Sequence, residues 1–155
     1  MNNSHSALRP ILLAEDNPND VELTLSALRD LNLVNEIVVV NDGRQALDWL
    51  TRTGAYAGLP TPVPAVVLLD LKMPKIDGLE VLRQLRQLPA FATTPVVILT
   101  SSREESDLAK GYQLGVNAYV VKPVEFEEFV SAVNQLGVFW ALLNEPPPGQ
   151  IIRTP

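Results

Sequence analysis

The sequence predicts an α/β fold in which five parallel strands form one sheet with helices on both faces. Three observations carry this prediction: short apolar runs recur along the chain, amphipathic segments separate them, and helix-start signals open those segments. The 155 residues are enough for one domain with a substantial core. We expect that domain at residues 10–144, between an N-terminal arm (1–9) and a proline-rich tail (145–155).

Five apolar runs are the predicted strands. Most are β-branched and uninterrupted, which is typical of strands buried on both faces of a parallel sheet. They are ILLA (11–14), EIVVV (36–40), AVVLL (65–69), VVIL (96–99) and AYVV (118–121). Strand–helix units repeated in this way imply a doubly wound (βα)₅ sheet with right-handed crossovers.

Helix starts are marked by caps. Asn17 suits an N-cap and Pro18 the first helical position, and apolar residues follow at helical spacing. Three pairs fit a capping box: Asp42 with Gln45, Asp77 with Glu80, and Ser102 with Glu105. The last helix should begin near Glu125, and its sheet-facing residues are predicted to be Phe126, Phe129, Val130, Val133, Leu136 and Trp140. A loop with three prolines (53–64) interrupts the regular alternation.

Composition excludes several classes of function. A net charge of −6 disfavours DNA or RNA as a partner, because nucleic-acid binding needs a basic face. Without cysteine, thiolate sites and disulfides are impossible, and the lone histidine, His5, excludes multi-histidine metal sites. The chain has neither a membrane-spanning apolar run nor the apolar centre of a signal peptide, so we expect a cytoplasmic protein without a membrane partner.

Polar residues follow the predicted strands at the edge where doubly wound sheets carry their sites. They are Glu15, Asp16, Asp70, Thr100 and Lys122. With the strand order 2-1-3-4-5, the first and third strands are neighbours, so three carboxylates converge. Such crowding of like charges is costly unless a cation is present, and ligands that are all oxygen favour Mg²⁺. Acids, Mg²⁺, a lysine and a hydroxyl suit phosphoryl chemistry with a carboxylate nucleophile.

Simpler interpretations exist for each residue alone. Glu15 and Asp16 can merely complement the dipole of the first helix. Lys122 can form an ordinary salt bridge, although a cis peptide bond to Pro123 would fix its direction. Thr100 can be a plain strand-end residue. The combination favours a site over these separate explanations.

Four motifs together resemble the response-regulator receiver domains of two-component signalling. They are LLAEDN (12–17), LLDLKMPKIDG (68–78), ILTSS (98–102) and NAYVVKP (117–123). The resemblance covers residues 10 to about 143 and implies a flavodoxin-like sheet of order 2-1-3-4-5. It also implies that Asp70 accepts a phosphoryl group from a histidine kinase. Such a protein is a signalling switch and not an enzyme, apart from catalysing its own phosphotransfer and dephosphorylation.

The resemblance assigns further roles. The ligands of Mg²⁺ would be Glu15, Asp16, Asp70 and the backbone carbonyl of Lys72. Thr100 and Lys122 would contact the phosphoryl group, and Tyr119 would be the aromatic residue that moves on phosphorylation. Tyr119 can equally be a half-buried strand tyrosine whose hydroxyl group is exposed to solvent. The side chain of Lys72 would pair with the phosphoryl group or with Glu15.

A narrower resemblance concerns stand-alone receivers that serve phytochrome histidine kinases. It rests on the loop at 53–64 and on FWALLNEPPPG (139–149). Because the chain ends soon after the last helix, we expect output through another protein. Val138, Phe139 and Leu142 lie off the sheet-facing side of that helix, which predicts a homodimer through it. The alternative is that Ile151 and Ile152 fold back over these residues.

Two other functions are weighed against the receiver. A Mg²⁺-dependent phosphatase of the haloacid-dehalogenase type also uses a strand-end aspartate, but it needs a second aspartate where Lys72 stands. A pseudo-receiver adaptor would not be phosphorylated, and the complete set of site residues argues against it. Nucleotide binding is disfavoured because neither a GxGxxG nor a Walker A pattern occurs.

Overall fold

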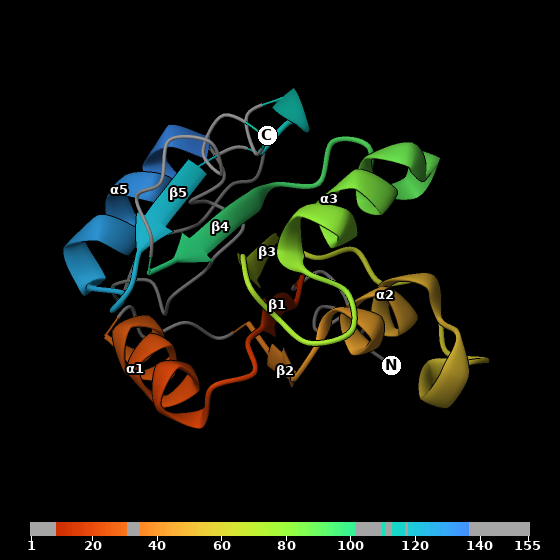
Figure 1. Ribbon diagram of the computed structural model, residues 1–155, viewed down its shortest axis with the longest axis horizontal. Coiled ribbons are helices and arrows are strands. Elements are labelled where there is room, and N and C mark those ends of the chain that lie inside the picture. Colours follow the sequence, from red (N-terminus) through yellow and green to blue (C-terminus); the bar gives the residue numbers. More distant parts are fainter. Residues whose placement is uncertain (1–8, 31–34, 102–109, 111–112, 117, 137–155) are drawn as a thin grey trace, which may run out of the picture.

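Five parallel strands form a single sheet with helices on both faces in the computed structural model (Figure 1). The structure describes residues 9–30, 35–101, 110, 113–116 and 118–136. The order of the strands is β2-β1-β3-β4-β5, and each neighbouring pair is parallel. The predicted doubly wound sheet of order 2-1-3-4-5 is confirmed.

The strands are β1 (Ile11–Ala14), β2 (Ile37–Val40), β3 (Val66–Asp70), β4 (Val96–Thr100) and β5 (Ala118–Val121). The helices are α1 (Pro18–Arg29), α2 (Gly43–Thr51), α3 (Gly78–Gln87) and α5 (Phe126–Leu136), with 3₁₀ turns η2 (Gly54–Tyr56) and η3 (Pro89–Phe91). The predicted loop at 53–64 therefore contains one short turn of helix. No helix in the described ranges is both long and apolar enough to span a membrane.

Strand boundaries differ slightly from the prediction, and the difference matters for the site. Asp70 is the last residue of β3 and pairs with Leu99, while Thr100 is the last residue of β4 and pairs with Val121. Both polar residues therefore belong to the ladder itself. The sheet, rather than a loop, fixes the backbone from which their side chains project.

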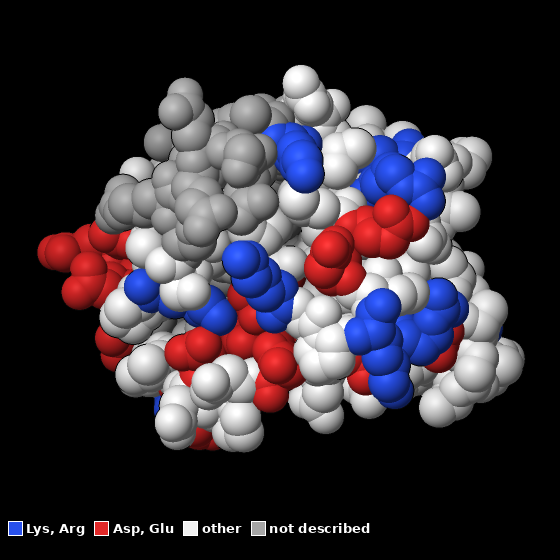
Figure 2. Space-filling view, in the orientation of Figure 1, with Lys and Arg blue, Asp and Glu red and all other residues white. Residues whose placement is uncertain are grey.

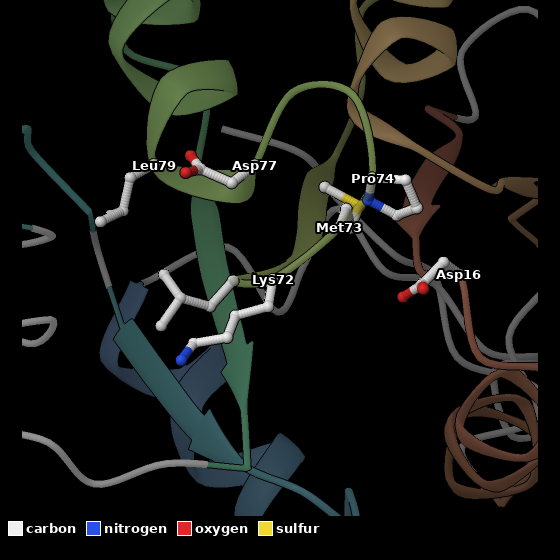
Figure 3. Close-up of a pocket in the computed structure, with 7 residues that line it drawn as sticks. Asp16, Lys72, Met73, Pro74, Asp77 and Leu79 are labelled. Carbon is white, nitrogen blue, oxygen red and sulfur yellow. The ribbon is translucent and has the colours of Figure 1, made fainter.

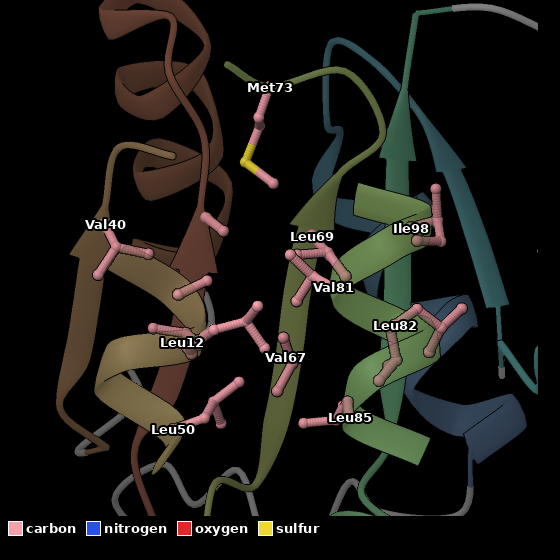
Figure 4. Close-up of a cluster of buried hydrophobic side chains, with 14 of the residues drawn as sticks. Leu12, Val40, Leu50, Val67, Leu69, Met73, Val81, Leu82, Leu85 and Ile98 are labelled. Atoms are coloured by element: carbon pink, nitrogen blue, oxygen red, sulfur yellow. The ribbon is translucent and has the colours of Figure 1, made fainter. Parts of the chain in front are cut away.

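The core consists of two layers, one on each face of the sheet. On β1, Ile11 and Leu13 pack with residues of α1 and α5, whereas Leu12 and Ala14 pack with residues of α2 and α3 (Figure 4). The same alternation runs through β3 and β4, which are buried on both faces as predicted. Strand β2 departs from this pattern, because it lies at the edge of the sheet and leaves Val39 38% exposed.

Helix α5 packs on the sheet through only part of its predicted face. Phe129 is fully buried and Val130 is partly buried against the same cluster. The expectation for Phe126 is wrong, because this residue is 37% exposed. It opens the helix at the carboxyl edge, where the strands have already ended. The side chains of Val133 and Leu136, and all of Trp140, lie outside the described residues.

Three side-chain caps fix the starts of α1, α2 and α3. The side-chain oxygen of Asn17 accepts hydrogen bonds from the backbone N–H groups of Asn19 and Asp20, at 2.8 and 3.1 Å. The carboxylates of Asp42 and Asp77 accept from the N–H groups of Gln45 and Glu80, at 2.8 and 2.9 Å. These predicted caps are confirmed. The proposed pair of Ser102 and Glu105 falls outside the described part of the chain.

The loop between β3 and α3 is packed tightly against the first turn of α2. A Cβ atom added to Gly43 would lie 1.9 Å from the carbonyl oxygen of Ile76, which leaves no room for any other residue. Lys75 has a left-handed φ of 69°, and its amine lies 3.5 Å from a carboxylate oxygen of Asp42. At the end of the loop, a Cβ on Gly78 would lie 2.3 Å from the carbonyl oxygen of Asp70.

Candidate functional site

The predicted site residues meet at the carboxyl edge of the sheet. Backbone hydrogen bonds continue past the strand ends. The N–H of Glu15 donates to the carbonyl of Val40 at 3.0 Å, and the N–H of Lys122 donates to the backbone carbonyl of Thr100 at 2.8 Å. These bonds place side chains from four segments around one pocket of about 210 Å³. Its lining residues are Glu15, Asp16, Asn17, Asp20, Asp70, Leu71, Lys72, Thr100, Ser101 and Lys122.

Lys122 lines this pocket and contacts three carboxylates. Its amine nitrogen lies 2.9 Å from Asp20 Oδ2, 3.1 Å from Glu15 Oε1 and 3.2 Å from Asp70 Oδ1. Burial alone would lower the pKa of Lys122, but the hydrogen bond to Asp20 and the charges of Asp70 and Glu15 outweigh it, so the pKa is raised. Lys122 therefore stays cationic, and its peptide bond to Pro123 is cis.

Two buried acids face this lysine. Glu15 is fully buried, and its burial, followed by the hydrogen bond to Asp70 and the charge of Asp70, raises its pKa to about 7. Its second oxygen accepts a hydrogen bond from the N–H of Asn17 at 3.3 Å. Burial also raises the pKa of Asp70, against the effects of Glu15 and Lys122. Without a second cation, the pocket cannot readily hold both carboxylates ionised.

The carboxylates of Glu15, Asp16 and Asp70 form a group suited to a divalent metal ion. Each offers an oxygen atom, and the three oxygens lie within 4.8 Å of one another. Glu15 and Asp70 are buried while Asp16 is exposed, so the group opens to solvent on one side. Three oxygen ligands with an excess of negative charge fit a hard divalent cation. The predicted convergence of the three acids is present.

A second pocket of about 510 Å³ adjoins the site along the β3–α3 loop (Figure 3). It is lined by Asp16, Leu71, Lys72, Met73, Pro74, Asp77 and Leu79. Lys72 lines both pockets, is exposed, and directs its amine away from Asp16 (Figure 3). The cation paired with Glu15 in this structure is Lys122, at 3.1 Å. On the surface, acidic side chains gather between α1 and α3 with basic side chains nearby (Figure 2).

The remaining predicted residues occupy the rim. Thr100 is 2% exposed and lines the same pocket as Asp70. Tyr119 is half-buried in β5, where it packs against the core layer beneath α2 and α3. That position agrees with the expectation of a half-buried strand tyrosine. Val138, Phe139 and Leu142 lie outside the described residues, so the predicted dimer surface is not described either.

Asp20 belongs to the site although the sequence did not single it out. It lies in the first turn of α1, where an acid is explained by the helix dipole alone. Its contact with Lys122 joins residues 102 positions apart. The available signal was its position: Asp20 lies in the first turn of the helix that starts directly after Glu15 and Asp16, so it stays close to the same strand end.

Comparison with known proteins agrees with this geometry. Residues 11–134 match the response regulator receiver domain model. The solved structure of the bacteriophytochrome response regulator AtBRR is 62% identical, covers 89% of this chain and 99% of that chain, and gives a TM-score of 0.80. Response regulator Rcp1 from Synechocystis sp. is 34% identical over 140 residues, which are 90% of this chain and 94% of Rcp1.

Two further crystal structures bear on the site. The Mn²⁺-bound form of Rcp1 covers 90% of this chain and 99% of that chain at 34% identity, with a TM-score of 0.71. The phosphorylated cyanobacterial phytochrome response regulator RcpA is 36% identical, covers 86% of this chain and 94% of that chain, and also gives a TM-score of 0.71. The fold, the carboxyl-edge cluster and these matches lead to one conclusion: the chain belongs to the response regulator receiver domain family.

Proposed function

We propose that this receiver accepts a phosphoryl group from a histidine kinase onto Asp70, and that phosphorylation changes its interactions with another protein. The observation that carries the proposal is the position of Asp70 at the end of β3, 3.2 Å from the buried amine of Lys122 and beside two more acids. We assign the receiver to residues 10–144, with the arm (1–9) and the tail (145–155) outside it.

In the proposed step, a carboxylate oxygen of Asp70 attacks phosphorus. The new P–O bond forms as the P–N bond to the kinase histidine breaks. The imidazole, protonated on its second nitrogen, leaves as the neutral ring with the electron pair of the broken bond. Lys122 and the hydroxyl of Thr100 bind the oxygens of the transferred group and stabilise their charge.

The metal that the acids would hold is Mg²⁺, through Glu15, Asp16, Asp70 and the backbone carbonyl of Lys72. When bound, it neutralises the phosphoryl oxygens and reduces repulsion between the anionic donor and the carboxylates. We further propose that Tyr119 responds to phosphorylation, and that two copies pair through the last helix, with Val138, Phe139 and Leu142 as candidate contacts.

A labelling experiment tests the central proposal. In Mg²⁺, the wild-type chain should take up one phosphoryl group from a small acyl phosphate, and EDTA should abolish the uptake. Asp70→Asn should not be labelled, because its amide is a poor nucleophile. Unlabelled wild type, or equal labelling of Asp70→Asn, would refute the assignment. Steady turnover of phosphate esters would instead support the phosphatase alternative.

The phytochrome-type kinase is proposed from the relatives AtBRR and RcpA, which are described as phytochrome response regulators. Competition between an autophosphorylated bacteriophytochrome kinase and an unrelated histidine kinase tests it. The phytochrome kinase should transfer its phosphoryl group to this chain at least ten times faster. Equal rates from the two kinases would contradict this part of the proposal and leave phosphorylation of Asp70 intact.

A further inference from the structure

The carboxylate nearest to Lys122 is one that the proposed reaction does not use. Asp20 Oδ2 lies 2.9 Å from the lysine amine, closer than the oxygens of Glu15 and Asp70 at 3.1 and 3.2 Å. The Asp20 side chain is 26% exposed and the Lys122 side chain only 10%. The pair is therefore a partly shielded, charge-assisted hydrogen bond.

Asp20 differs from the other two partners because it stands outside the metal-binding group. The carboxylate oxygens that converge in the described structure come from Glu15, Asp16 and Asp70. A divalent cation held by these acids would engage two of the three carboxylates that now face Lys122, and it would repel the ammonium group. Asp20 would remain as the carboxylate that faces only the lysine.

The position of Asp20 is itself fixed. Its backbone N–H donates to the side-chain oxygen of Asn17 at 3.1 Å, and the N–H of Val21 donates to the carbonyl of Asn17 at 2.9 Å. The cap therefore sets the first turn of α1 relative to the end of β1. A lysine has a flexible four-carbon stem, and holding it in one direction costs conformational entropy unless a partner fixes it.

We propose that Asp20 is a positioning residue that keeps the amine of Lys122 directed at the phosphoryl site while the metal occupies the other acids. This inference rests on the proposed phosphorylation of Asp70. An ammonium group has three N–H donors, so Lys122 can keep one bond to Asp20 and use the others for phosphoryl oxygens. Asp20 touches neither the metal nor the transferred group and acts only through Lys122.

The test uses the full chain and two measurements at Mg²⁺ concentrations that saturate each variant. One is the affinity for beryllofluoride, a phosphoryl mimic, from ¹⁹F NMR; the other is the initial rate of labelling by acetyl phosphate. Asp20→Asn is isosteric and removes only the charge. Glu22→Gln makes the same charge change on the same helix, at an exposed carboxylate that lies 4.0 Å from Arg29.

We expect Asp20→Asn to weaken beryllofluoride binding and slow labelling by about tenfold, the effect of losing one charge-assisted hydrogen bond. Glu22→Gln should stay within about twofold of wild type. In a Lys122→Ala background, adding Asp20→Asn should change beryllofluoride affinity by less than about twofold, because the group through which it acts is gone.

Three results would overturn the positioning role. Asp20→Asn could behave like Glu22→Gln, or its full effect could persist in the Lys122→Ala background. It could also bind beryllofluoride more tightly, which would mean that Asp20 competes with the phosphoryl group for the lysine. If the wild type neither binds the mimic nor becomes labelled at Asp70, the proposed function fails first and this inference fails with it.

Discussion

Glu15→Gln should remove a pH dependence of stability from the metal-free protein. In the folded chain the pKa of Glu15 is raised from 4.5 to about 7, mainly by burial. The folded state therefore binds a proton that the unfolded state releases between these two pH values. The stabilisation due to this proton is complete below pH 4.5 and is lost as the pH rises to about 7.

The size of the effect follows from the same pKa. At 1.36 kcal/mol per pKa unit, raising the pKa from 4.5 to about 7 corresponds to about 3 kcal/mol. The free energy of unfolding of the wild type, relative to that of Glu15→Gln, should fall by about this amount between pH 4.5 and 7. Glu80, whose hydrogen bond from Arg83 lowers its pKa to about 2, titrates below this window.

Urea unfolding in EDTA at several pH values measures this difference, with tryptophan fluorescence as the signal, to which the buried Trp49 contributes. Glu22→Gln serves as the control, because its exposed carboxylate should leave the wild-type slope unchanged. The difference in the free energy of unfolding between wild type and Glu15→Gln could instead vary by less than about 0.5 kcal/mol between pH 4.5 and 7. That result would show that Glu15 does not have the raised pKa expected of a buried carboxyl group.

Three further outcomes are expected. Mg²⁺ at about 100 times its dissociation constant should stabilise the wild type by about 2.7 kcal/mol in urea unfolding, and Asp16→Asn should lose most of this gain at the same concentration. Gly78→Ala should destabilise the fold by about 3 kcal/mol, because the added Cβ would lie 2.3 Å from the backbone oxygen of Asp70. Gly58→Ala is the matched control: its φ of 88° disfavours alanine but its Cβ would meet no atom, so it should cost only about 1 kcal/mol. Phe129→Ala should cost about 4 kcal/mol and Phe126→Ala about 1 kcal/mol by the same assay, since the first is fully buried and the second 37% exposed; equal losses would contradict the described packing of α5.

The sequence predicted what depends on local pattern. Uninterrupted β-branched runs identified the strands, and side chains such as Asn17 and Asp77 identified the helix starts, because capping is a contact between near neighbours. The convergence of Glu15, Asp16 and Asp70 also followed, since parallel strands bring their carboxyl ends to one edge.

Features that depend on how the helices and strands are placed relative to one another could not be predicted from the sequence. The helix dipole alone explains an acid such as Asp20 in the first turn of α1. Its contact with Lys122, at 2.9 Å, arises only because the folded chain brings α1 beside the end of β5. Helical spacing put Phe126 on the sheet-facing side of α5, but spacing does not say where the sheet stops. The predicted strand order placed β2 at the edge of the sheet, but its apolar run did not indicate that Val39 would be exposed.

The close contact between Gly43 and the carbonyl of Ile76 limits how this site can be re-engineered. The β3–α3 loop carries Lys72, which lines both pockets of the site. That loop keeps its shape only against a helix whose first residue lacks a side chain. The loop and the start of α2 are therefore one transplantable unit, and a chimaera that exchanges residues 71–77 must keep glycine at position 43.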